Sequence, residues 1–363
     1  MKLTRRDFGR VAGAAVIAGI LPHAHGQSEG RRIGWCIVGL GRISMDHFMP
    51  GVKEGQKGRI VALVSGHRDK AERQAAMYGV ADNAIYSYED YDRIRDNREI
   101  DAVYIALPNS MHAAYTIRAA KAGKHVLSEK PMATSVTDCK AMIEACRAAD
   151  KKLMIAYRCQ YEPVNLKAIE LIRAGALGSV QAIESANGFN ISAGEWRLNR
   201  KLSGGGPLMD VGIYSLNASR YLTGEEPLDI HANSSVIDHD GRFREVEENI
   251  GWTMKFPSGI VASCNTSYGS DMNGFYRVHG SKGMIELSPA FGYQGIHMKA
   301  EIYGQEPIDM PDPQHGPEQF TVQADYFADC VWNNKTPKSD GEEGLWDIKL
   351  MSEIYLSAGL PGL

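Results

Sequence analysis

Short apolar runs alternate with longer amphipathic stretches over the first half of the chain. The amphipathic stretches have the spacing of helices and fall at residues 69–79, 111–123 and 135–150. Strands that alternate with helices in this way predict a Rossmann-type, doubly wound parallel sheet in an α/β protein. The apolar runs, which we predict to be its buried strands, are residues 33–38, 60–65, 101–108, 124–131 and 152–158.

The N-terminal segment has a different pattern. Arg5 and Arg6 precede an apolar run at residues 11–21, and the segment has a small-residue ending, "AHG", at Gly26. This order is typical of a secretory peptide, and the paired arginines indicate the Tat route. As a helix the apolar run would rise about 16 Å, against about 30 Å for a bilayer core, so it is too short for a permanent anchor. We predict a signal peptide at residues 1–26, export of the folded chain to the periplasm, and no stable membrane association after cleavage. The alternative is a basic N-terminal extension on a cytoplasmic protein.

Length and composition narrow the picture further. The chain has 363 residues and a formal net charge of −4, and a mildly acidic protein is a poor partner for nucleic acid. The length without the signal favours two domains, which we place at residues 27–157 and 158–363. No metal site is predicted, because no metal-ligand spacing occurs among Cys36, Cys139, Cys146, Cys159, Cys264 and Cys330.

The turn after the first predicted strand carries a phosphate-binding pattern. Gly39 allows a tight turn, and Gly41 lets the backbone approach a pyrophosphate at the start of the next helix. Ser44 occupies the third position, where Gly or Ala is usual. A G-x-G pattern is weak evidence by itself, but its place between a strand and a helix favours a dinucleotide site.

The end of the second predicted strand indicates which dinucleotide is bound. A carboxylate there would bind the ribose 2′-hydroxyl of NAD and repel a 2′-phosphate, but this strand runs into "SGHRDK". Ser65 and the N–H of Gly66 can bond a phosphate, and Arg68 or Lys70 can supply positive charge. These residues favour NADP(H) over NAD. The same turn can also cap the helix that begins near Asp69.

Two further stretches carry reactive side chains. Glu129 and Lys130 follow a strand at the edge where open α/β sheets bind ligands. Asp210 and Tyr214 are four residues apart after a Gly-rich turn, which places them on one face of a helix. Taken singly, Asp210 could be a charge at a helix N-terminus and Tyr214 a core aromatic.

Together these stretches identify a relationship. "LVSG", "DAVYIALPNSMHA", "KAGKHVLSEKPMATSV", "KKLMIAYRCQY", "GGGPLMDVGIYSLNASRYLTGEEP" and "GEEGLWDIKL" resemble the Gfo/Idh/MocA family of sugar-type dehydrogenases, and within it the glucose–fructose and aldose–aldose oxidoreductase subgroup. The resemblance extends over about residues 33–358. It implies a second, α+β domain at residues 158–363 with a large, mostly antiparallel open sheet. One face of that sheet would meet the active site and the other a second subunit.

The resemblance also assigns roles to residues. It implies that Lys130, Asp210 and Tyr214 are catalytic. A free phenol is a poor base near neutrality, so we expect the Lys130 ammonium to lower the pKa of Tyr214, which then acts as acid and base while Asp210 orients the sugar. The rival assignment makes Asp210 the base. The predicted cofactor-lining residues are Gly39, Leu40, Gly41, Arg42, Ile43, Ser65, Gly66, Arg68, Lys70, Leu107, Pro108, Asn109, His112, Glu129, Lys130, Arg158, Trp196 and Arg197.

Export constrains the expected activity. Little free NADP is available outside the cytoplasm, so an exported enzyme must keep its cofactor and reoxidise it with a second substrate. We expect tightly bound NADP(H) and a ping-pong cycle, in which one aldose is oxidised to its lactone and a second sugar is reduced to its alditol. The alternatives are a sugar dehydrogenase with diffusible NADP, a glycoside hydrolase that uses bound nicotinamide transiently, and a sensing protein with a vestigial site. Glucose–fructose oxidoreductase has a long arm after its signal that embraces a neighbouring subunit; only residues 27–32 fill that place here, which favours a homodimer over a tetramer.

Overall fold

The computed structural model of the chain describes residues 32–311 and 318–363. The predicted signal peptide at residues 1–26 lies outside the described residues. Within the described ranges, no helix has the length and apolar character needed to cross a bilayer. Every cysteine of the chain falls in these ranges, and each is buried and unpaired.

The first sheet has the predicted doubly wound form. Its strand order is β3-β2-β1-β4-β5-β6 and all its pairings are parallel, which confirms the predicted fold class. Side chains of β1 are buried along its whole length, as expected for a strand covered on both faces. The strands are β1 (Ile33–Val38), β2 (Gly58–Val64), β3 (Ile85–Tyr86), β4 (Ala102–Ile105), β5 (His125–Ser128) and β6 (Leu153–Ile155).

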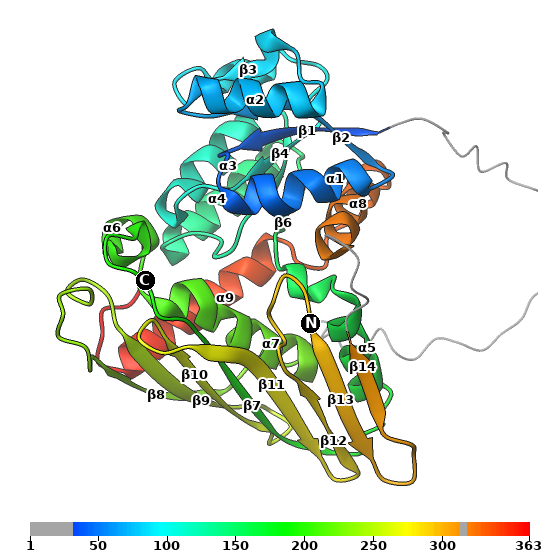
Figure 1. Cartoon of the computed structure of the whole chain (residues 1–363), viewed down its shortest axis with the longest axis vertical. Helices are drawn as coiled ribbons and strands as arrows, with labels where there is room; N and C mark the ends of the chain where they lie inside the picture. Colours follow the sequence, from blue (N-terminus) through cyan, green and yellow to red (C-terminus); the bar gives the residue numbers. More distant parts are fainter. Residues whose placement is uncertain (1–31, 312–317) are drawn as a thin grey trace, which may run out of the picture. The chain divides into compact units, whose positions relative to one another are not determined.

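Strand β1 has the predicted bounds, β4, β5 and β6 end earlier than the apolar runs predict, and the two-residue β3 was not predicted. The residues after β4 and β5 leave the sheet and form loops at its carboxyl edge (Figure 1). The helices between the strands are α1 (Met49–Glu54), α2 (Arg68–Tyr78), α3 (His112–Lys121) and α4 (Val136–Ala148).

The second sheet is larger and lies beside helices on one face only. Its strand order is β14-β13-β12-β11-β7-β10-β9-β8, and all pairings are antiparallel except that of β7 with β10. Helices α5 (Pro163–Arg173), α7 (Ile213–Thr223) and α9 (Gly341–Ser357) pack on the inner face. The strands are β7 (Val180–Gly188), β8 (Asp229–Ser235), β9 (Asn249–Lys255), β10 (Val261–Ser267), β11 (Met272–Gly280), β12 (Gly283–Leu287), β13 (His297–Ile302) and β14 (Ile308–Pro311).

The chain returns to the first sheet near its end. Helix α8 (Glu318–Trp332) packs on α1 and β2, beside which it is drawn in Figure 1. Phe327 of α8 packs against Trp35 at a ring distance of 5.5 Å, and a Cβ at Gly51 would lie 2.9 Å from the Cβ of Phe320. A division of the chain at residue 158 therefore assigns α8 to the second domain by sequence, although α8 packs against the first sheet and its helix α1.

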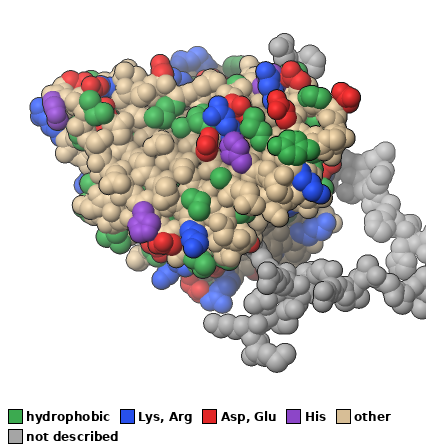
Figure 2. All heavy atoms as spheres, turned by 90° about the horizontal axis from the view of Figure 1, so that it is seen from below, with side chains coloured by type: hydrophobic (Ala, Val, Ile, Leu, Met, Phe, Trp, Pro, Cys, Tyr) green, Lys and Arg blue, Asp and Glu red, His purple; other side chains and the backbone are tan. Residues whose placement is uncertain are grey.

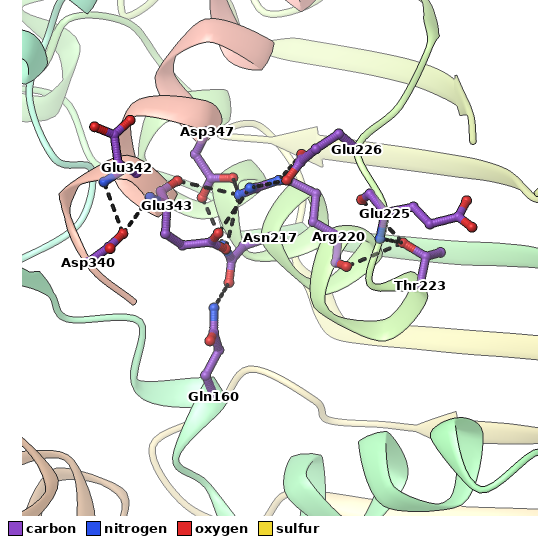
Figure 3. A network of polar contacts seen from close by, with 10 residues as sticks. All are labelled: Gln160, Asn217, Arg220, Thr223, Glu225, Glu226, Asp340, Glu342, Glu343 and Asp347. Carbon is purple, nitrogen blue, oxygen red and sulfur yellow. Dashed lines mark hydrogen bonds and ion pairs between the residues drawn. The ribbon is translucent and has the colours of Figure 1, made fainter. Parts of the chain in front are cut away.

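A buried charge network joins α7 to α9 (Figure 3). The Arg220 side chain is 2% exposed and pairs with Glu226 at 2.6 Å, Glu343 at 3.1 Å and Asp347 at 2.5 Å. Asn217 donates to Asp347 and accepts from Gln160. Burial raises the pKa of Asp347 and of Glu343, against the opposing charge of Arg220. One cation thus balances more than one carboxylate, and the network depends on it.

Candidate active site

The glycine turn has the geometry that a dinucleotide requires. Gly39 has φ +94°, and a Cβ there would lie 2.3 Å from the carbonyl oxygen of Ala106. A Cβ at Gly41 would meet nothing within 4 Å, so open space lies in front of this turn. The Ser44 hydroxyl donates to the Gly39 carbonyl at 2.6 Å and holds the turn closed.

These features fit a bound pyrophosphate. Helix η2 (Ile43–Phe48) starts directly after the turn and continues into α1, and the free N–H groups at a helix start attract an anion. Leu40 is buried, whereas Gly41 and Arg42 are exposed. Ser44 therefore supports the turn by a side-chain hydrogen bond, which the Gly or Ala usual at this position could not form.

The turn after β2 carries the residues predicted to contact a 2′-phosphate. The Ser65 hydroxyl accepts from the N–H of His67 at 3.1 Å, within its own turn. Arg68 is not directed to a common site with Ser65: its Nε donates to Glu72 at 2.8 Å and its Nη1 to the Ile85 carbonyl at 3.3 Å. Gly66 is exposed and Lys70 half-buried, and the contact of Ser65, Gly66, Arg68 and Lys70 with a phosphate stays a prediction.

The loops after β4 and β5 are tied to each other. The ring nitrogens of buried His112 lie 2.8 Å from the Pro131 carbonyl oxygen and 2.9 Å from that of Leu107. Burial lowers the pKa of His112, and the hydrogen bonds to the Pro131 and Leu107 carbonyls oppose this effect. Pro108 precedes a short helix η5 (Asn109–Met111), and Asn109 donates to the Ser203 carbonyl at 2.8 Å. His112 and Asn109 therefore position the loops through their side chains.

The predicted catalytic residues come together from both halves of the chain. Lys130 follows β5, Asp210 lies in helix η8 (Leu208–Gly212), and Tyr214 lies in the first turn of α7. Nζ of Lys130 donates to the Asp210 carbonyl at 2.5 Å, lies 3.6 Å from Oδ1 of Asp210, and lies 4.6 Å from the ring centre of Tyr214. The N–H groups of Gly206 and Leu208 donate to Glu247, which holds the Gly-rich turn before η8 in place.

Asp210 is kept ionised by its neighbours. Burial would raise its pKa, but Lys130, Arg197 and a hydrogen bond from Tyr268 outweigh burial and hold the pKa below its usual value. Arg197 Nε lies 2.9 Å from Oδ2 of Asp210, and the Tyr268 hydroxyl donates to the same oxygen at 2.9 Å. The Arg197 guanidinium also lies over the Trp196 ring at 4.8 Å. A carboxylate with a low pKa is a weak proton acceptor and a good hydrogen-bond acceptor.

The expected lowering of the Tyr214 pKa by Lys130 is not seen. Burial raises the pKa of Tyr214 above its usual value, and the cation that opposes burial is Arg158. Lys130 contacts the face of the Tyr214 ring while its ammonium donates to Asp210. Both cations lie over the Tyr214 ring, but Arg158 also forms a side-chain hydrogen bond with Tyr214, whereas the Lys130 ammonium donates to the Asp210 carbonyl.

Glu129 and Arg158, both predicted to line the cofactor, have protein partners. Tyr104 donates to Oε1 of Glu129 at 2.5 Å. Burial raises the pKa of Glu129, although Tyr104, Lys130 and Arg158 oppose it. Arg158 is 5% exposed, and its guanidinium lies over the rings of Tyr214 and Tyr293. A cofactor contact by either residue stays a prediction.

The sequence analysis missed two residues of this site. Tyr268 bonds Asp210, and Tyr293 stacks on His47 of η2 at a ring distance of 4.0 Å and on Arg158 at 4.4 Å. Tyr268 lies in the stretch "SYGSD", but no spacing there predicts a contact with Asp210. Neither Tyr293 nor its loop has a pattern that would have identified it. No cluster suited to a metal ion occurs in the part of the chain that the structure describes.

Comparison with known proteins gives consistent matches. The model of the oxidoreductase family with an NAD-binding Rossmann fold matches residues 33–157, and the Gfo/Idh/MocA C-terminal domain model matches residues 165–286. The NADP(+)-dependent D-xylose 1-dehydrogenase of Haloarcula marismortui is 32% identical over 88% of this chain and 89% of its own.

Solved structures match over the same extent. The aldose–aldose oxidoreductase of Caulobacter crescentus, complexed with glycerol, is 45% identical with a TM-score of 0.87, over 91% of this chain and 98% of its own. A 3-ketoreductase of Actinomadura kijaniata, in complex with NADP and TDP-benzene, shares the fold at 21% identity and a TM-score of 0.75, over 91% and 97% of the two chains.

Proposed function

The chain belongs to the Gfo/Idh/MocA family of oxidoreductases, and from this premise we propose that it is a periplasmic sugar oxidoreductase that keeps NADP(H) bound. One aldose is oxidised at C1 to its lactone and leaves, and a second sugar is then reduced to its alditol. The similarity to an aldose–aldose oxidoreductase over nearly the whole chain supports this pairing of substrates.

The proposal rests on one observation about the described site. Lys130 lies between the Asp210 carboxylate and the Tyr214 ring, at the edge of the sheet where the glycine turn also lies. A sugar in front of Tyr214 would therefore reach a proton-transferring phenol, a fixed carboxylate and a cation together. Such positioning is the main contribution that the protein makes to hydride transfer.

The residues divide the chemistry as follows. A bound nicotinamide supplies the hydride acceptor for C1 of the first sugar and the hydride donor for the carbonyl carbon of the second. Tyr214 takes the hydroxyl proton in the oxidation and returns a proton to the carbonyl oxygen in the reduction. Asp210 accepts hydrogen bonds from sugar hydroxyls, because its low pKa makes it the weaker base. Lys130 donates to the sugar oxygen and fixes the Asp210 backbone.

The predicted signal peptide supports cofactor retention. A folded chain exported with its dinucleotide cannot exchange it in a compartment that holds little free NADP. Gly39, Leu40, Gly41, Arg42 and Ile43 form the turn that would hold the pyrophosphate, with open space before Gly41.

A single incubation tests this proposal. Protein purified from the periplasmic fraction is given one aldose and no added cofactor, and we expect equal amounts of lactone and alditol. The matched control is the same protein with its dinucleotide removed, which should be inactive until NADP is restored. Turnover that needs NADP in every cycle would instead indicate a dehydrogenase, and cleavage of a glycoside without alditol a glycoside hydrolase.

Ser65→Asp should weaken NADP retention about tenfold or more relative to NAD, because a carboxylate would face the 2′-phosphate. An Asp side chain can still accept from the N–H of His67, so the turn should remain intact. Ser65→Asn adds the same bulk without charge and should retain NADP. Both are checked by the ratio of the two dinucleotides bound after equilibration with a mixture. Equal retention in the Asp and Asn variants would remove this turn from the phosphate site.

We also propose that the outer face of the large sheet joins two copies of the chain. Figure 2 views the molecule from the side of this sheet and shows a broad surface on which uncharged side chains and backbone predominate, with charged side chains scattered among them. A hollow of about 870 Å³ on it is lined by polar residues such as Asn233 and Asn265 and by apolar residues such as Met272 and Phe275. Light scattering of the mature protein should give the mass of a dimer.

A further inference from the structure

The Arg158 guanidinium is clamped in one position between two phenol rings. Its central carbon lies 4.9 Å from the ring centre of Tyr214 and 4.4 Å from that of Tyr293. Nη2 donates to the Phe291 carbonyl at 2.5 Å, and Nη1 donates to the Gly292 carbonyl at 2.8 Å.

A second helix completes the clamp. Gln319 of α8 accepts from Nη1 of Arg158 at 2.8 Å, so the terminal nitrogens of Arg158 are bonded to neutral groups only. The Nε–H is buried and has no hydrogen-bond partner among the described residues. A buried guanidinium without a carboxylate partner is costly unless an anion forms nearby. Two nearby groups can become that anion: the Glu129 carboxyl, on which the charge of Arg158 acts, and the Tyr214 phenol, with which Arg158 also forms a side-chain hydrogen bond.

We propose that Arg158 is the positioning residue whose charge stabilises the Tyr214 phenolate during proton transfer, the role that the sequence suggested for Lys130. This inference rests on the proposed acid–base role of Tyr214. It assigns Lys130 to Asp210 and the sugar, which agrees with the hydrogen bond from its ammonium to the Asp210 carbonyl.

The other charged and titratable groups around Tyr214 do not replace Arg158. Burial raises the pKa of Tyr214, Arg158 lowers it, and Cys159 and Glu129 raise it further. Tyr293 and Tyr104 are neutral phenols whose own pKa values burial raises. The groups that face Tyr214 are therefore Lys130, Arg158, Cys159, Glu129, Tyr293 and Tyr104.

The test compares Arg158→Met, which keeps an apolar stem without charge, with Arg158→Lys, which keeps the charge. Single-turnover reduction of the bound dinucleotide by an aldose is followed by absorbance across pH. The rate should rise with pH until the phenol ionises, and this rising part of the pH–rate profile is called its limb. In the Met variant the limb should lie about one pH unit or more higher, and the rate near neutrality should be about tenfold lower. The Lys variant should keep its limb within about half a unit of the wild type's.

Several outcomes decide the question. A loss of rate in the Met variant that is equal at every pH, or a limb that does not move, overturns the inference, because a merely structural defect has no pH dependence. If the Met variant does not retain its dinucleotide, Arg158→Gln keeps donors for the Phe291 and Gly292 carbonyls without the charge and carries the same expectation. Tyr214→Phe is measured in parallel: if it keeps the rate and the limb, the proposed role of Tyr214 fails, whatever Arg158 does.

Discussion

Tyr214→Phe is expected to lower the turnover number by about 10²–10⁴-fold, because the variant loses the group that takes and returns the sugar proton. The ring and its contacts with Lys130 and Arg158 remain, so the fold and the bound dinucleotide should be unaffected. The Michaelis constant should change little, since binding through Asp210 and Lys130 is preserved. Steady-state product formation and the absorbance of the retained dinucleotide measure the two effects separately.

A matched tyrosine provides the control for this variant. Tyr91 is buried and donates its hydroxyl to the Tyr115 carbonyl at 3.2 Å, outside the proposed catalytic group. Tyr91→Phe also deletes one buried hydroxyl and should leave turnover within about twofold of wild type while costing about 1 kcal/mol of stability. If Tyr214→Phe kept a tenth or more of the wild-type turnover, Tyr214 would not be the acid and base, and Asp210 would take that place.

Arg220→Met is expected to lower the free energy of unfolding by about 3–5 kcal/mol, because it leaves carboxylates in a buried site without their cation. The Arg220 side chain is 2% exposed and Asp347 is fully buried. The loss should depend on pH. Carboxyl groups whose folded pKa is raised above the unfolded value cost stability above the folded pKa, and this cost disappears as pH falls through it. Urea unfolding at about pH 7.5 and about pH 5 should therefore show a larger deficit at the higher pH.

Arg147→Met is the comparison for this prediction. Arg147 pairs with Glu144 at 2.5 Å, the same separation as Arg220 from Asp347, but the side chains of Arg147 and Glu144 are mostly exposed. An exposed pair contributes little, so the expected change is below about 1 kcal/mol and nearly constant with pH. A deficit for Arg220→Met of the same size as for Arg147→Met would show that the network does not hold α7 and α9 together.

The local sequence pattern was sufficient to predict the first sheet, the glycine turn and the family. Apolar runs and helical spacing predicted the first sheet, because a side chain's burial repeats with the geometry of its own strand or helix. Gly39 was predictable for the same reason: its φ of +94° is a property of one residue in one turn. The motifs around Lys130, Asp210 and Tyr214 identified the family, since each is a short continuous stretch, and their spacing on one helix placed Asp210 near Tyr214.

The tertiary structure decided which charges these groups meet. Arg197 and Tyr268 reach Asp210, and Arg158 reaches Tyr214, from segments that no local period connects. A pKa depends on every charge within a few ångströms and on burial, so it follows from contacts between distant parts of the chain. For this reason the residues of the site could be listed from the sequence, whereas the assignment of Lys130 to Asp210 and of Arg158 to Tyr214 required the folded chain.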